Sequence, residues 1–148
     1  MINVGVIGYG YWGPNLVRNF SASSETQVHA VSDLDEKRLG LVRKRFPAVE
    51  VTTDFQALLT NPKIDAVAIA TPVSSHFELA LQALRANKHV FVEKPLAATA
   101  EQAKRLVEEA DKRQLLLHVD HTFIYTGAVR KMQQLVETGE LGELYYYD

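Results

Sequence analysis

The feature that most constrains the fold of this chain is a glycine-rich turn between two segments of different character. Residues 2–7 form a short apolar run typical of a buried strand, and the turn Gly8-Tyr9-Gly10-Tyr11-Trp12-Gly13 follows at once. Pro14 comes directly after the turn, and proline suits the first turn of a helix because its missing N–H has no intrahelical partner there. The order of strand, glycine turn and helix predicts a dinucleotide-binding unit.

Each glycine of the turn has a separate purpose in such a unit. Gly8 lets the chain turn sharply out of the strand, and Gly10 leaves room for the backbone to approach a pyrophosphate. Gly13 lets the following helix pack against the sheet. The pyrophosphate then lies on free amide groups at the positive end of the helix dipole, and Tyr11 and Trp12 contribute backbone amides and cleft-wall side chains.

An acidic residue lies at the distance expected for the ribose end of such a site. Asp33 follows the second apolar run, residues 28–31, and lies about twenty residues beyond Gly13. A carboxylate there accepts hydrogen bonds from the adenosine ribose and repels a 2′-phosphate, which favours NAD over NADP. Arg38 leaves NADP open, since a nearby guanidinium can pair with a phosphate. The alternative is that the glycines only make a tight strand-to-helix turn.

Short apolar runs alternate with amphipathic segments along the rest of the chain. Further strands are predicted at residues 28–31, 49–52, 64–70, 89–92 and 115–119. Helices are predicted after Asp35, over 54–59, from a capping box of Ser75 and Glu78 to a left-handed Asn87, after a second capping box of Thr99 and Gln102, and over 128–138 before Gly139. Six strands separated by helices predict an α/β fold: one domain over residues 1–148, with a doubly wound parallel sheet of the Rossmann type in three α/β/α layers.

Charge and composition exclude several classes of protein. The chain has 16 Lys and Arg against 18 Asp and Glu, and no basic cluster of the kind that binds nucleic acid. It has no cysteine, which excludes disulfides and thiolate metal sites. No stretch approaches the length that spans a bilayer. We therefore expect a soluble, cytoplasmic protein without nucleic acid or membrane partners.

Polar residues follow three of the predicted strands at the edge where ligands bind in parallel sheets. They are the segments Ala70-Thr71-Pro72, Glu93-Lys94-Pro95 and Asp120-His121-Thr122. His118 and His121 point to opposite faces of a strand, so we predict no metal site there. His76, in the first turn of a helix, is expected to be structural.

With this arrangement the sequence closely resembles the Gfo/Idh/MocA family, named after glucose-fructose oxidoreductase and inositol dehydrogenase. The resemblance covers essentially the whole chain, through the glycine turn, Ala70-Thr71-Pro72 and residues 88–96, where Glu93-Lys94-Pro95 is the most specific element. The glycine turn with Pro14 and Asn15, and residues 121–125, look most like members that oxidise nucleotide-linked or other sugars.

The resemblance implies roles for particular residues. Lys94 would lie between the nicotinamide ring and the substrate hydroxyl, orient that hydroxyl and assist proton transfer. Glu93 would hydrogen-bond the nicotinamide ribose, and Pro95 would fix the direction of Lys94 through an extended or cis backbone. Thr71 and its neighbours Ala70 and Pro72 would form a backbone wall near the cofactor. His121 and Tyr125 are candidates to face substrate, whereas Asp120 stands where many members carry glycine and receives no role.

The chain departs from the family in one large respect. Family members continue into a second α/β domain that supplies a catalytic histidine and most of the substrate pocket. Residues 144–148 look like the start of that domain's first strand. We therefore expect a chain that binds NAD and does not oxidise its sugar or polyol substrate alone. Two alternatives are a non-catalytic NAD-binding or sensing module, and an assembly unit that forms a homo-oligomer through its terminal strand.

Overall fold

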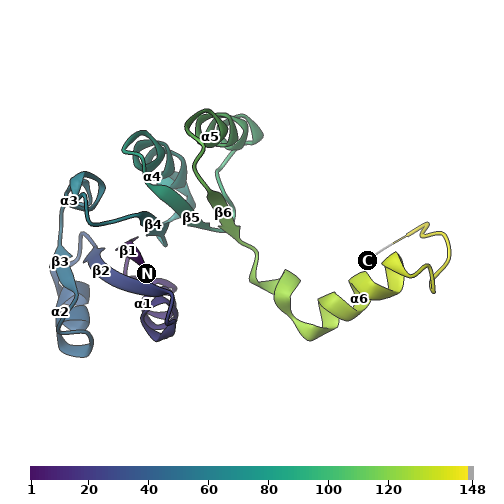
Figure 1. Cartoon of the computed structure of the whole chain (residues 1–148), viewed down its shortest axis with the longest axis horizontal. Helices are drawn as coiled ribbons and strands as arrows, with labels where there is room; N and C mark the ends of the chain where they lie inside the picture. The colour runs from purple at the N-terminus through teal and green to yellow at the C-terminus, as the bar shows by residue number, and fades with distance from the viewer. Residues whose placement is uncertain (147–148) are drawn as a thin grey trace.

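The structure is a computed structural model of the chain, and it describes residues 1–146. Strands and helices alternate through most of the chain (Figure 1). The strands are β1 (Ile2–Ile7), β2 (Thr26–Ser32), β3 (Glu50–Thr52), β4 (Ala66–Ile69), β5 (His89–Glu93) and β6 (Leu117–Asp120). The helices are α1 (Gly13–Ala22), α2 (Glu36–Arg45), α3 (Gln56–Thr60), α4 (Val73–Arg85), α5 (Ala100–Arg113), the 3-10 helix η1 (Thr122–Tyr125) and α6 (Gly127–Glu137).

The six strands form one sheet in the order β3-β2-β1-β4-β5-β6, and every neighbouring pair is parallel. The order reverses between β1 and β4, so the connections leave these two strands in opposite directions and open a crevice at their carboxyl ends. The predicted doubly wound Rossmann sheet is therefore confirmed. β4 is shorter than the predicted run of residues 64–70, because Ile64, Asp65 and Ala70 lie in the flanking turns.

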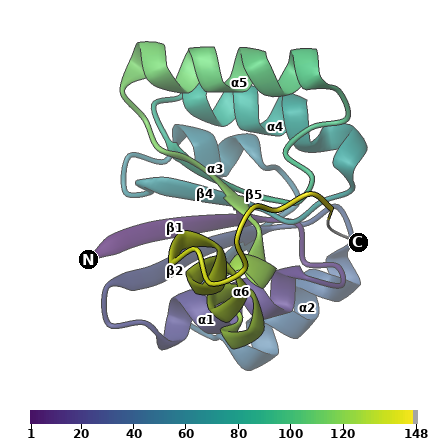
Figure 2. The ribbon, with the colours of Figure 1, turned by 90° about the vertical axis from the view of Figure 1, so that its right-hand side faces the viewer.

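Helices cover both faces of the sheet and complete three layers (Figure 2). α1 and α2 lie on one face over a core that includes Val6, Val31 and Leu39. α3, α4 and α5 lie on the other face over a second core that includes Ile69 and Leu106. The central strands β1 and β4 are apolar on both faces because both are covered, as is usual for parallel sheets.

The helix termini agree with the predicted caps at two of three places. The side chain of Asp35 accepts a hydrogen bond from the Lys37 amide, and Thr99 accepts one from Gln102. The capping box predicted for Ser75 and Glu78 is wrong, because α4 already begins at Val73, after an extended Pro72. Ser75 instead lies inside the first turn, where its hydroxyl donates to the hydroxyl of Thr71 and the carbonyl of Pro72. Asn87 is left-handed (φ 58°), as predicted for the end of α4.

The chain leaves the body of the fold after β6 (Figure 1). The sequence did not indicate η1, whereas the predicted helix before Gly139 is present as α6. The strand predicted for residues 144–148 is absent from residues 144–146, since no neighbouring strand is there to take up their backbone hydrogen bonds. Residues 147 and 148 lie outside the described part. None of the described helices has the length and apolar character that a bilayer crossing requires.

Candidate dinucleotide site

The glycine turn is shaped by two close backbone approaches. Gly8 has φ +96°, and a β-carbon on it would lie 2.7 Å from the carbonyl oxygen of Ala70. A β-carbon on Gly13 would collide with the carbonyl oxygen of Gly8. Gly10 is different, because its nearest neighbour in that direction is the Arg38 guanidinium at 3.6 Å. Packing therefore demands glycine at two positions, and the third keeps open space on the cleft side.

The start of α1 offers free amide groups to this space. Trp12 occupies the N-cap position, and no side chain of the described residues caps the helix. Pro14 has no N–H and the Asn15 amide donates to the carbonyl of Trp12, so the amides of Trp12 and Gly13 are the ones left at the positive end of the helix dipole. These free amides can therefore bind a diphosphate group. A turn that served only for packing would not need free amides at this place.

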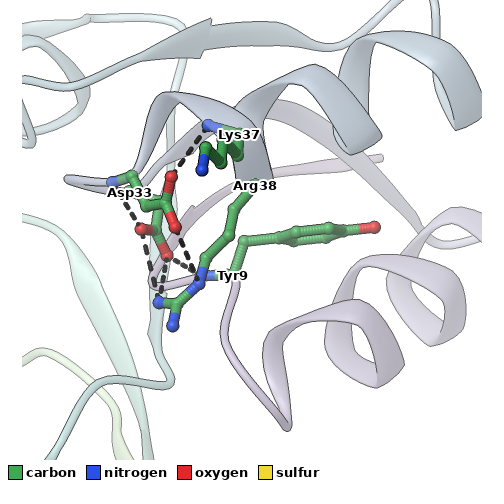
Figure 3. Close-up of polar contacts among 5 residues, drawn as sticks. Tyr9, Asp33, Lys37 and Arg38 are labelled. Atoms are coloured by element: carbon green, nitrogen blue, oxygen red, sulfur yellow. Dashed lines mark hydrogen bonds and ion pairs between the residues drawn. The ribbon is translucent and has the colours of Figure 1, made fainter.

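Asp33 fastens the end of β2 to the glycine turn (Figure 3). Its side chain is 6% exposed; one oxygen accepts a hydrogen bond from the Tyr9 amide at 2.6 Å and the other accepts from the Asp35 amide at 2.8 Å. These bonds fix the carboxylate at the edge of the cleft. Contact of this carboxylate with a ribose stays a prediction.

Arg38 lies across the same end of the cleft (Figure 3). Its guanidinium is 3.4 Å from Asp33 Oδ2 and 3.7 Å from Asp35 Oδ2, and its side chain is 49% exposed. Two carboxylates therefore balance much of its charge, while one side remains open to solvent.

A cleft of about 1080 Å³ joins these groups to the ends of β4 and β5. It brings together most of the predicted site residues: Gly8, Gly10, Tyr11, Trp12, Asp33, Arg38, Ala70, Thr71, Pro72, Glu93 and Lys94. Gly13 supports the turn from behind. Thr122, from the third predicted strand-end segment, also lines the wall, together with residues that the sequence analysis did not place in the site, among them Phe55, His76 and Phe123. They come from loops and helix starts, where periodicity carries no signal.

His76 contacts two loops of the cleft, the turn after β4 and the turn after β5. It is buried, with Nε2 at 2.8 Å from the carbonyl oxygen of Thr71 and Nδ1 at 2.8 Å from that of Pro95. The Lys94–Pro95 peptide bond is cis. The imidazole thus sets the spacing between the turn after β4 and the turn that carries Lys94. In the sequence, this role was indicated by a single histidine on an otherwise apolar face of the predicted helix.

Two carboxyl groups meet at the ends of β5 and β6, where Glu93 is the register partner of Asp120. Asp120 is 8% exposed and accepts a hydrogen bond of 3.4 Å from the indole N–H of Trp12. Burial is the first cause that raises the pKa of the Glu93 carboxyl to about 7; a hydrogen bond with Asp120 and the charge of Asp120 add to it, and Lys94 opposes it. A carboxyl group with a pKa of about 7 therefore lies beside Lys94 in the cleft.

The structure does not bring His121 and Tyr125 into the cleft wall. Both are exposed, because η1 turns the chain away from the body, and the Tyr125 ring lies under the Arg130 guanidinium at 5.9 Å. Their contact with substrate stays a prediction. His118 stacks on Phe91, and no group of three potential metal ligands occurs among residues 1–146.

Comparison with known proteins agrees with this geometry. Residues 2–121 match a family described as "Oxidoreductase family, NAD-binding Rossmann fold" (GFO_IDH_MocA). A dTDP-3,4-didehydro-2,6-dideoxy-alpha-D-glucose 3-reductase from Saccharopolyspora spinosa is 39% identical over 121 residues, which are 82% of this chain and 36% of that protein.

Two solved structures are similar over nearly the whole chain. A 3-ketoreductase from Actinomadura kijaniata in complex with NADP and TDP-benzene has a TM-score of 0.85 at 33% identity and covers 93% of this chain and 42% of its own. A scyllo-inositol dehydrogenase from Lactobacillus casei with NAD(H) and scyllo-inositol has a TM-score of 0.90 at 26% identity and covers 97% and 43%.

The match is confined to one part of these proteins. The chain spans 36% to 43% of the length of the curated relatives it matches. The glycine turn, the whole sheet and the cleft apart from Thr122 and Phe123 lie within the part that matches the family. The chain therefore belongs to the Gfo/Idh/MocA oxidoreductase family and comprises its NAD(P)-binding Rossmann domain.

Proposed function

We propose that this chain is the cofactor-binding part of a dehydrogenase that oxidises a sugar or polyol with NAD. The observation that carries the proposal is the continuity of the cleft. One end holds a ribose-binding carboxylate, Asp33; the middle offers the amides of the glycine turn; and the other end holds Glu93 and Lys94. A dinucleotide needs these three kinds of group in this order. The printed names of the relatives support a sugar or inositol as substrate.

Each part of the cleft has a separate task in this proposal. When bound, the nicotinamide accepts a hydride from a carbinol carbon. The amides at the start of α1 hold the pyrophosphate, and Asp33 accepts hydrogen bonds from the adenosine ribose. Glu93 accepts hydrogen bonds from the second ribose. Lys94 is the proposed catalytic residue, which orients the substrate hydroxyl and assists removal of its proton.

We further propose that these residues do not complete the reaction alone. Lys94 is a proton-transfer assistant here, and the principal base and most of the substrate pocket would lie in the longer protein. The purified chain, mixed with NAD and myo-inositol or glucose, should therefore form no NADH above the rate without protein. Absorbance at the NADH band measures this, and turnover would contradict the proposal.

Cofactor choice follows from the two charged groups at the adenosine end. The Asp33 carboxylate repels a 2′-phosphate, and the charge of Arg38 is already balanced by Asp33 and Asp35. We propose that NAD is preferred, although NADP occurs in one of the similar structures. Parallel calorimetric titrations with NAD and NADP test this, and tighter binding of NADP would contradict it.

A matched pair of variants separates the two carboxylates. Asp33→Asn removes the charge beside the ribose but keeps a hydrogen-bond acceptor, so NADP binding should improve about tenfold relative to NAD. Asp35→Asn keeps the N-cap of α2, because asparagine caps as well as aspartate, and should shift the ratio less, because it weakens only the pairing of Arg38 and leaves the Asp33 charge beside the ribose. Equal shifts in both variants would mean that the general charge of this region, and not Asp33, sets the preference.

A further inference from the structure

Asp120, the strand neighbour of Glu93, has no place in the mechanism above. The two residues are register partners at the carboxyl ends of adjacent strands. Asp120 is buried and does not belong to the cleft wall among the described residues, whereas Glu93 does. Of the two carboxyl groups, that of Glu93 is therefore the one in the cleft wall.

Two negative charges in this position repel each other with little water to screen them. The oxygen Oε1 of Glu93 is buried and has no hydrogen-bond partner among the described residues when the group is ionised. Two carboxylates have no proton to donate to one another, so a hydrogen bond between them requires that one of them is protonated. One shared proton therefore removes the repulsion and satisfies a buried oxygen.

The surrounding charges do not remove the need for that proton. Lys94, in the same turn, is the one positive side chain that contributes to the ionisation of Glu93. Trp12, from the glycine turn, donates its neutral N–H to Asp120 at 3.4 Å. From α4, His76 points its ring nitrogens at the carbonyls of Thr71 and Pro95 and not at the pair.

We propose that Asp120 is a positioning residue that shares one proton with Glu93, and that this makes dinucleotide binding dependent on pH. The inference rests on the proposed function, in which ionised Glu93 accepts hydrogen bonds from the nicotinamide ribose. At low pH the shared proton occupies Glu93. At higher pH both groups are ionised, and Glu93 turns to the ligand.

The direction of the expected pH dependence follows from the pKa of the Glu93 carboxyl. Its pKa is raised to about 7, so the group is mainly neutral at pH 6 and mainly ionised at pH 8. If only the ionised form accepts the ribose hydroxyls, affinity for NAD rises by up to about tenfold between these two values. NAD itself has no group that titrates in this range.

The first test needs no ligand. Carboxyl ¹³C NMR of the chain, followed from pH 3 to pH 9, should show a step of the Glu93 resonance near neutrality, and the neighbouring Asp120 resonance should respond to the same step. In Asp120→Asn the Glu93 step should move to lower pH, because the asparagine amide donates to the carboxylate without repelling it. A single step for Glu93 in the ordinary carboxyl range of the wild type would overturn the proposal.

A second variant guards against misfolding of the first. In Glu93→Gln, the step near neutrality should disappear, because the carboxyl that takes up the proton has been removed. Circular dichroism identifies whichever variant remains folded, and the wild-type titration stands by itself if both unfold. A step near neutrality that survives both substitutions belongs to another group and would overturn the proposal.

The binding test distinguishes this inference from the proposed function. Calorimetry with NAD at pH 6 and pH 8 should give a clear ratio of affinities for the wild type and a ratio near one for Asp120→Asn. In Arg38→Ala, affinity changes at both pH values but the ratio should persist. A wild-type ratio near one, with binding intact, overturns the inference alone. Failure to bind NAD at either pH overturns the proposed function, while the NMR titration still decides whether the proton is shared.

Discussion

The body of the fold, residues 1–120, and the arm that follows it, residues 121–146, bury their apolar residues to very different extents. The body contains two closed cores on the two faces of the sheet. No residue of the arm is buried, and Phe123, Ile124 and Tyr125 are each at least half exposed. The arm keeps its helix through local hydrogen bonds, whereas the body is held by contacts between distant segments.

The helices of the body and of the arm have the same kind of sequence pattern, and they differ in what packs against their apolar face. α5 and α6 both carry apolar residues at helical spacing, but α5 buries Leu106 and Ala110 against the sheet. In α6, Met132 and Val136 remain 40% and 46% exposed. An amphipathic pattern therefore predicts a helix and one face that needs cover, without naming what covers it. Among the described residues, nothing buries this face of the arm.

The strongest way to break the body is at its glycine turn. Gly8→Ala forces a side chain into a left-handed backbone, against the carbonyl of Ala70, and should lower the free energy of unfolding by about 2–4 kcal/mol. Urea denaturation measures the loss. Gly40→Ala is the matched control, because Gly40 lies inside α2 with open space around it; it should stabilise the chain by about 0.5–1 kcal/mol. A similar sign for both variants would contradict this account.

The next largest effect is expected at the histidine that joins two turns of the body. His76→Leu leaves the carbonyls of Thr71 and Pro95 without that partner and should cost about 2–3 kcal/mol of stability. NAD affinity should fall as well, because the turn with Lys94 loses its support. His121→Leu, in the exposed start of the arm, should change stability by less than about 0.5 kcal/mol. Thermal and urea unfolding of both variants sharpen the comparison between body and arm.

A smaller effect should appear when pH is varied. The pKa of Glu93 is raised from 4.5 to about 7 in the folded chain, so the folded state retains a proton that the unfolded state releases. The free energy of unfolding should therefore fall as pH rises from about 4.5 to about 7. Asp120→Asn should flatten the fall over this window. A rise in stability attributable to Glu93 over the same range would contradict the sign.

The smallest effect should come from removing the arm beyond the cleft. A chain that ends at residue 126 keeps Thr122 and Phe123, which line the cleft. It loses α6, in which no residue is buried. Its unfolding midpoint and its NAD affinity should match those of the whole chain within error. A large drop in stability would mean that α6 packs on the body in solution.

Much of the fold was predictable because it depends on local patterns. The strand runs, the Asp35 and Thr99 caps, the left-handed Asn87 and the glycine turn each act over a few residues. The capping box at Ser75 failed because Pro72 starts the helix earlier and the Ser75 hydroxyl finds other acceptors. Short local signals compete, and neighbouring contacts decide between them.

The site was predictable in part for the same reason. The three segments at strand ends converge because parallel strands place their carboxyl ends together, so topology alone led to Thr71, Glu93 and Lys94. His76 and Asp120 were given no role in the site. His76 matters because two backbone carbonyl groups lie beside its ring, and Asp120 matters because it is the strand neighbour of Glu93.

The sequence by itself determined that this chain forms a parallel α/β sheet with a dinucleotide turn, since periodicity and glycine spacing are properties of neighbouring residues. Only the tertiary structure decided that Asp33 is held by Tyr9 and Arg38, that His76 joins two turns, and that Glu93 meets Asp120. Most of these contacts join residues far apart along the chain, and those of Asp33 with Arg38 and of His76 with Thr71 join neighbouring elements. Their energies depend on distance and burial, which exist only once the chain has folded.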